Sequence, residues 1–164
     1  MKKMNKKGFT LVELLAVIAI LAILMLLVTP NILNMFKEGK KSSFVTQAQS
    51  IYKAAEQKFI SESIKTPGAY TFTNVTSTAT NKATLDISGS SDVKYCVKVN
   101  TNGEITKLEV SDSSYILSVG DGSSTISIDA VSTKTSGEYS NLHVIGDKIT
   151  QSGTETYAAI SSCN

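Results

Sequence analysis

The stretch that decides the fold runs from Gly8 to Val28 and reads GFTLVELLAVIAILAILMLLV. Between Phe9 and Val28 the only polar residues are Thr10 and Glu13. A helix of this length spans about 30 Å, which is the thickness of the hydrocarbon core of a bilayer. The preceding residues 1–7, MKKMNKK, are basic, and lysines beside a span favour the cytoplasmic side. The sequence therefore predicts one membrane-spanning helix with a cytoplasmic N-terminus.

Two other kinds of N-terminal signal fit this segment poorly. A secretory signal peptide would place small residues at a cleavage site after the apolar run, and Leu27 to Asn31 has no such character. A lipoprotein signal would need a cysteine just past the run, whereas the first cysteine is Cys96. A plain single-span anchor is the alternative. It gives no account of Glu13, because a lone carboxylate at that depth costs several kcal/mol.

A role in assembly would account for Glu13. If a peptidase cuts after Gly8, the new chain begins with the cationic amine of Phe9, at a helix end whose dipole disfavours positive charge. We expect neither charge to have a partner in an isolated helix within lipid. When a second helix packs alongside, displaced along its axis, its amine can meet the Glu13 carboxylate. Because a broken buried ion pair is costly, this pairing would select one axial stagger between neighbouring subunits.

The segment from Lys6 to Leu15, KKGFTLVELL, resembles the class III signal peptide of type IV prepilins and pseudopilins. That family has a short basic leader ending in Gly, then a hydrophobic residue, then Glu as the fifth mature residue. Many members also have a proline where this chain has Pro30. The resemblance covers residues 6–30, and it implies a membrane prepilin peptidase that cuts after Gly8 and methylates the amine of Phe9. It also implies that Glu13 is the assembly carboxylate.

The same resemblance implies an α+β pilin fold, in which a long N-terminal helix packs on an antiparallel β-sheet head. We expect a cleaved leader at residues 1–8 and a hydrophobic transmembrane and assembly helix at residues 9–36. Residues 37–164 would then form the globular head, which includes the amphipathic second half of the helix.

Helical periodicity continues beyond the membrane segment and predicts one helix from about Thr10 to Ile64. Pro67-Gly68 ends it, since the residue before a proline disfavours helix. The apolar stripe of its second half consists of Phe44, Ala48, Ile51, Ala55 and Phe59, widened by Tyr52 and Ile60.

Pro30 and Gly39 are predicted weak points of this helix. Proline lacks an N–H, and glycine weakens a helix by about 1 kcal/mol relative to alanine. Pro30 either only kinks the chain at the membrane exit or marks a place where the helix melts on assembly.

The second half of the chain predicts the sheet. Residues 68–83 are small and polar and favour a long connection. Alternating apolar residues predict strands at residues 93–99, 104–110 and 115–119, with residues 125–131 and 142–145 as further candidates. We expect an antiparallel sheet laid on the apolar stripe of residues 44–60.

No catalytic constellation is visible in the head, so we predict neither an enzyme nor a cofactor. His143 has no second histidine and is interpreted as an ordinary strand residue. Asp112-Ser113-Ser114 and Asp121-Gly122-Ser123 offer oxygens that calcium prefers, but such runs are more often turns, and we predict no metal. Without the four lysines of residues 1–7, twelve lysines face fourteen carboxylates, and 12 − 14 = −2 argues against a nucleic-acid-binding head.

The only two cysteines, Cys96 and Cys163, are predicted to form a disulfide, since the head would lie outside the cytoplasm. Cys96 shares a strand face with Lys94 and Lys98, out of phase with the buried residues, so core filling explains it poorly. Two free thiols are the alternative, in an organism that seldom oxidises its surface proteins.

The resemblance implies a structural subunit of a type IV pilus, which serves adhesion, twitching motility or aggregation. The alternative is a pseudopilin of a type II secretion or DNA-uptake system. Implied partners are other copies of the chain, minor pilins, the prepilin peptidase and the membrane assembly platform, while host or surface ligands stay open. The implied precursor is single-pass in the cytoplasmic membrane and then enters an extracellular surface filament.

Overall fold

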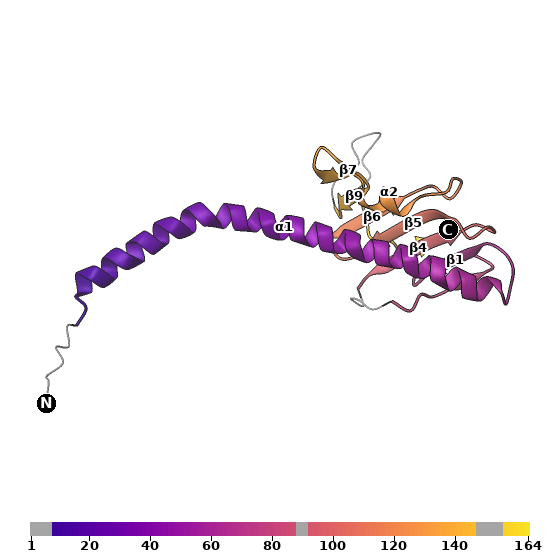
Figure 1. Ribbon diagram of the computed structural model, residues 1–164, viewed down its shortest axis with the longest axis horizontal. Coiled ribbons are helices and arrows are strands. Elements are labelled where there is room, and N and C mark those ends of the chain that lie inside the picture. The colour runs from indigo at the N-terminus through magenta and orange to yellow at the C-terminus, as the bar shows by residue number, and fades with distance from the viewer. Residues whose placement is uncertain (1–7, 88–91, 147–155) are drawn as a thin grey trace, which may run out of the picture. The chain divides into compact units, whose positions relative to one another are not determined.

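The structure is a computed structural model that describes residues 8–87, 92–146 and 156–164. The basic residues 1–7 of the predicted leader lie outside the described residues. The chain divides into two compact units, residues 1–40 and residues 41–164, and each is described by itself (Figure 1).

The helices are α1 (Leu11–Ser63) and α2 (Ile128–Ser132). The strands are β1 (Tyr70–Thr73), β2 (Thr76–Ser77), β3 (Lys82–Ala83), β4 (Lys94–Val99), β5 (Ile105–Ser111), β6 (Tyr115–Val119), β7 (Lys134–Thr135), β8 (Glu138–Tyr139), β9 (Leu142–Val144) and β10 (Ser162–Cys163). This α+β layout of a long N-terminal helix and a mostly antiparallel sheet confirms the predicted fold class.

The α1 helix has the predicted bounds to within a residue at each end. Pro30 and Gly39 both lie inside it without ending it. At its C-terminal end the hydroxyl of Tyr70 donates to the carbonyls of Glu62 at 3.1 Å and Thr66 at 2.9 Å. These contacts fasten the turn that follows α1 to the start of β1.

In the first unit, the large apolar side chains of α1 are exposed all round the helix. By length and composition this part of α1 could cross a membrane, which agrees with the predicted span. A helix that is apolar all round needs an apolar environment, either lipid or other helices.

The second unit is built on a six-stranded sheet with the order β3-β1-β4-β5-β6-β9. Neighbouring strands are antiparallel except for β1 and β3, which are parallel. The register pairs Phe72 with Val97, Val97 with Leu108 and Val110 with Leu117. These apolar pairs therefore form a continuous inner face across the centre of the sheet.

The second half of α1 packs on this inner face, and Figure 1 shows it crossing the strands. The predicted stripe is buried, with Ala48 and Ala55 at 0% exposure, because small side chains let the helix approach the sheet closely. Tyr52 is also buried, and its hydroxyl donates to the carbonyl of Ile126 at 2.9 Å. Ile60 was predicted to widen the stripe, but this was wrong: it is 64% exposed, while Val45 is buried instead.

The outer face of the sheet carries a second, smaller layer. Cys96 was predicted to share a face with Lys94 and Lys98, out of phase with the core, and it is nevertheless 0% exposed. The C-terminal tail covers it: the N–H of Ile160 donates to the hydroxyl of Ser111 at 3.0 Å, and β10 pairs with β2. A residue out of phase with the core is thus buried because a distant segment covers it.

The prediction of a long connection at residues 68–83 was wrong in part. This segment contains β1, which lies inside the sheet between β3 and β4, and also β2 and β3. In β1, Tyr70 and Phe72 join the core, while Thr71 and Thr73 lie on the other face. Threonine is polar but β-branched, so it suits a strand that is covered on both faces.

The remaining strand predictions were right in most cases and wrong in one. Residues 142–145 are largely in β9, and the strands predicted at 93–99, 104–110 and 115–119 are β4, β5 and β6. The candidate strand at 125–131 was wrong, since its second half begins α2. Ile128 and Val131, three residues apart, face the core from one side of this helical turn, as a helix spacing allows.

Candidate functional site: the N-terminal end of α1

Thr10 and Glu13 bind each other at the first turn of α1. The backbone N–H of Thr10 donates to Oε2 of Glu13 at 2.8 Å, and the hydroxyl of Thr10 donates to the same atom at 2.9 Å. In return the backbone N–H of Glu13 donates to the hydroxyl oxygen of Thr10 at 3.3 Å. This reciprocal arrangement is a capping box, and it provides partners for N–H groups that a helix start leaves unpaired.

The capping box corrects the expectation that Glu13 has no partner in an isolated helix. Its Oε2 atom already accepts two hydrogen bonds from Thr10. Within the part of the chain that the structure describes, no hydrogen bond or ion pair involves the other oxygen, Oε1. Thr10 of the same helix therefore holds the Glu13 carboxylate in one orientation through Oε2, and Oε1 stays available to accept a further hydrogen bond.

The sequence contains the signal for this cap, although only an assembly role was predicted for Glu13. Thr10-Leu11-Val12-Glu13 has the threonine and glutamate spacing typical of a capping box. The same carboxylate lies inside an apolar run, where its cost in lipid suggested an intermolecular partner. The local partner, Thr10, is the other polar residue of that run.

Gly8 and Phe9 lie just before the helix, outside its hydrogen-bonded turns. The Phe9 side chain is 90% exposed. The bond between these two residues is thus accessible in the chain itself, as a cleavage site requires, and the α-amine that cleavage would create lies close to the Glu13 carboxylate in sequence.

The other predicted site residues lie elsewhere. Pro30 and Gly39 are in α1, and a Cβ added at Gly39 would meet nothing within 4 Å. Thr29 donates its hydroxyl to the carbonyl of Met25 at 2.6 Å, a bond of a kind that often bends helices. Cys96 and Cys163, in the second unit, form the predicted disulfide.

The two candidate calcium turns are closed by their own hydrogen bonds. Oδ1 of Asp112 accepts the N–H groups of Ser114 and Tyr115, each at 2.6 Å, which shapes the β5–β6 hairpin. The hydroxyl and N–H of Ser123 both donate to Asp121 and lower the pKa of its carboxyl. Within residues 8–87, 92–146 and 156–164, no three His, Cys, Asp or Glu side chains gather as metal ligands would.

His143 lies in β9, and its ring stacks on that of Tyr157 with the centroids 3.9 Å apart. Burial lowers the pKa of its imidazole. This contact ties the tail after residue 155 to the edge of the sheet, so a packing role fits the interpretation of His143 as a strand residue.

Comparison with known proteins agrees with the site at the start of α1. No curated protein and no solved structure matches the chain. Residues 3–29 match the family described as the prokaryotic N-terminal methylation motif. This motif is that of a structural protein rather than of an enzyme family, and with the apolar helix it fits a membrane-anchored precursor. The chain therefore carries the class III signal peptide of type IV pilins, and this motif supports a type IV pilin-like or pseudopilin protein.

Proposed function

We propose that the chain is a structural subunit of a type IV pilus, which polymerises through its N-terminal helix into a surface filament for adhesion, motility or aggregation. The observation that carries this proposal is the class III signal, which extends into the first part of a helix whose apolar side chains are exposed in the chain itself. Such a surface is stable only in lipid or against other helices. A filament provides the second environment when the subunit leaves the membrane.

The geometry of Glu13 supports a defined stagger between subunits. Thr10 occupies Oε2, so Oε1 can accept the cationic amine of Phe9 from a neighbouring subunit without breaking the cap. An ionised carboxylate can accept hydrogen bonds from Thr10 and from the Phe9 amine together, since its two oxygens offer about four acceptor sites. The charge pair would form only when the neighbour is shifted along its axis, by about one helical turn, because Phe9 and Glu13 are four residues apart.

The proposal includes the processing steps and partners that the signal implies. The precursor inserts in the cytoplasmic membrane with its N-terminus inside, and a prepilin peptidase cuts after Gly8 and methylates the amine of Phe9. The trimmed subunit then meets the assembly platform, other copies of itself and minor pilins.

Intact-mass and N-terminal peptide analysis of the chain recovered from cells tests this proposal. The expected product begins at Phe9 and carries one added methyl group. A chain that retains Met1, or one cut after Val28, would show that the signal is not used as proposed. A Gly8→Leu variant provides the control, because blocking cleavage should leave the basic leader attached.

A pseudopilin of a secretion or DNA-uptake machine would share the leader, Glu13 and the helix. Electron microscopy of material sheared from the cell surface separates the two functions. Long filaments that contain this chain support a pilus subunit, and their absence in cells that process the chain normally supports a pseudopilin.

The weak points of α1 suggest that the helix melts between Pro30 and Gly39 on assembly. Because a Cβ at Gly39 meets nothing, Gly39→Ala should strengthen the helix by about 1 kcal/mol without a clash. High-resolution imaging of assembled filaments tests this directly, since a continuous helix through both positions in the filament would refute melting. Filaments with Gly39→Ala should stretch less under force than unaltered ones.

A further inference from the structure

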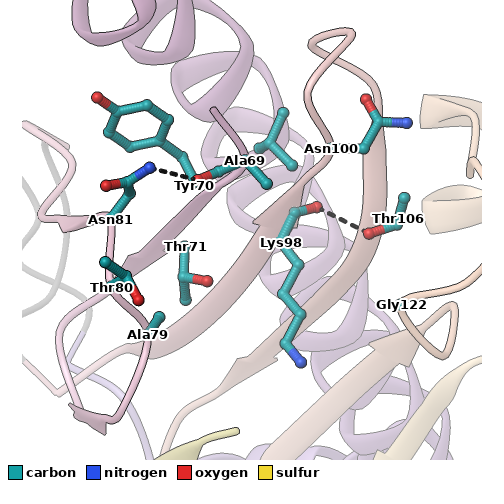
Figure 2. A pocket seen from close by; sticks show the side chains of 11 residues that line it. Ala69, Tyr70, Thr71, Ala79, Thr80, Asn81, Lys98, Asn100, Thr106 and Gly122 are labelled. Carbon is teal, nitrogen blue, oxygen red and sulfur yellow. Dashed lines mark hydrogen bonds between the residues drawn. The ribbon is translucent and has the colours of Figure 1, made fainter. Parts of the chain in front are cut away.

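A trough of about 490 Å³ lies over the outer face of the sheet, away from the helix (Figure 2). Its floor is made by side chains of three neighbouring strands, Thr71 of β1, Lys98 of β4 and Thr106 of β5. One wall is formed by residues 79–81 and the other by the loop at Gly122. The register places Thr71 directly opposite Lys98, so these groups are held side by side.

Hydrogen bonds attach both walls to the strands of the floor. The N–H of Thr71 donates to the carbonyl of Asn81 at 2.9 Å, and the side-chain amide of Asn81 donates to the carbonyl of Ala69 at 3.1 Å. On the other side, the N–H of Gly122 donates to the carbonyl of Thr106 at 3.1 Å. The trough is thus largely preorganised, which reduces the entropy cost of binding.

Lys98 is the one charged residue among the described residues that line the trough. Its side chain is half-buried and extends along the trough in Figure 2. Among the residues that the structure describes, none forms an ion pair with Lys98. By contrast, Lys107 on the next strand pairs with Glu109 at 3.1 Å. The described residues therefore give this ammonium group over the sheet no counter-charge.

The neutral polar groups around Lys98 differ in whether they are free to form hydrogen bonds with a ligand. Within the described parts of the chain, the hydroxyls of Thr71 and Thr80 take part in no hydrogen bond, and Asn81 uses only its amide nitrogen. Asn100 is occupied, since its Oδ1 accepts from Asn102 and Glu104 and its Nδ2 donates to Glu104. The trough thus presents one cation, two hydroxyls and an amide oxygen.

The described lining residues offer no aromatic face for ligands that need stacking. Tyr70 is the only aromatic residue among the described residues of the lining, and its ring contacts those of Phe59 and Phe72, with centroids 5.9 Å and 5.8 Å away. No aromatic face is therefore offered to a nucleobase, which single-stranded nucleic acids need for tight binding.

We propose that this trough binds a carboxylate-bearing saccharide. The Lys98 ammonium would pair with the carboxylate, while Thr71, Thr80 and Asn81 would bind ring hydroxyl groups. A charge-assisted hydrogen bond from an ammonium to a carboxylate is stronger than a neutral one, so the acid group determines which sugars bind. One such contact gives weak binding, and repetition of the trough along a filament would increase it through avidity.

The test uses the full chain in non-ionic detergent micelles and does not require a filament. The probes are a hyaluronan tetrasaccharide, which carries glucuronate carboxylates, and 3′-sialyllactose. Their carboxyl methyl esters serve as neutral counterparts. Calorimetry or ligand-observed NMR should show that at least one acid binds and that its ester binds at least tenfold more weakly. If neither acid binds, or if the esters bind equally well, the proposal is wrong.

Variants locate the site. Lys98→Gln should weaken binding at least fivefold, whereas Lys98→Arg should retain most of it. Lys94→Gln is the matched control: it removes the same charge from the same face of β4, but Lys94 does not line the trough. Equal loss in the Lys94 and Lys98 variants would indicate a general charge effect and overturn the proposal.

Tighter binding of a thymidine 12-mer that competes with the saccharide would instead assign the trough to nucleic acid. Circular dichroism confirms that each variant is folded.

Because this binding is measured on single subunits, it can succeed or fail independently of leader cleavage and filament formation.

Discussion

Cys96 and Cys163 are joined by a disulfide whose Cα atoms lie 5.4 Å apart, and both side chains are buried on the outer face of the sheet. The bond links the central strand β4 to the second-last residue of the chain. It lies beside the contact between Ser111 and Ile160, so the covalent link and the small buried layer hold the same tail. The tail in turn keeps water away from the part of the outer face around Cys96 and Ser111.

Removal of this disulfide should destabilise the second unit. Cross-linking residues that are 67 apart restricts the unfolded chain, and its loss through Cys96→Ala with Cys163→Ala should lower the free energy of unfolding by about 4 kcal/mol. Urea unfolding followed by circular dichroism measures this difference. Unaltered chain treated with reductant is the control and should match the double variant to within about 1 kcal/mol. Two reactive thiols in the denatured, unreduced chain would contradict the prediction.

Substitutions at the capping box should affect assembly of the filament without affecting insertion of the chain in the membrane. Glu13→Ala removes an intramembrane charge, so the chain should remain in the membrane fraction while filament yield falls sharply. Thr10→Ala removes only the cap, which is worth about 1 kcal/mol, and should reduce the yield less. Thr10→Ser keeps the hydroxyl and is the matched control. A normal filament yield from Glu13→Ala would refute the pairing of Glu13 with a neighbouring amine.

A truncated chain that begins at Lys37 should be soluble and monomeric. It lacks the exposed apolar part of α1 but keeps the stripe from Phe44 to Phe59, which the sheet covers. Size-exclusion chromatography with light scattering measures its mass. Aggregation would imply that the stripe packs against neighbouring subunits instead of the sheet.

Acidification should destabilise the second unit through His143, the only histidine of the chain. Burial lowers the pKa of His143 below its ordinary value of 6.5, so the unfolded chain takes up the proton more readily than the folded one. The free energy of unfolding should therefore decrease as the pH falls from about 7.5 to about 5.5.

The control is His143→Phe, which retains a ring to stack on Tyr157 but cannot be protonated. Urea unfolding at both pH values should show a smaller pH dependence in this variant. If the two proteins lose the same stability on acidification, His143 is not the responsible group.

The features that sequence alone predicted depend on residues close together in the chain. The basic leader, Gly8, Glu13 and the apolar run identify the signal and the membrane helix within residues 1–28. Alternation in residues 93–99 predicted both the strand and its buried face, because side chains in a strand alternate with period two. The predicted disulfide also followed from the sequence, since only two cysteines were available to pair.

Tertiary structure decided the features that depend on what covers a segment. The polar composition around β1 predicted a loop, yet its threonines lie inside a sheet whose other strands come later in the chain. Cys96 shares a face with Lys94 and Lys98, and it is buried only because residues near Ile160 return over that face. The trough around Lys98 likewise needs a wall from residues 79–81 and another from Gly122. Periodicity shows which side chains of an element share a face, whereas burial of that face depends on segments that only folding brings together.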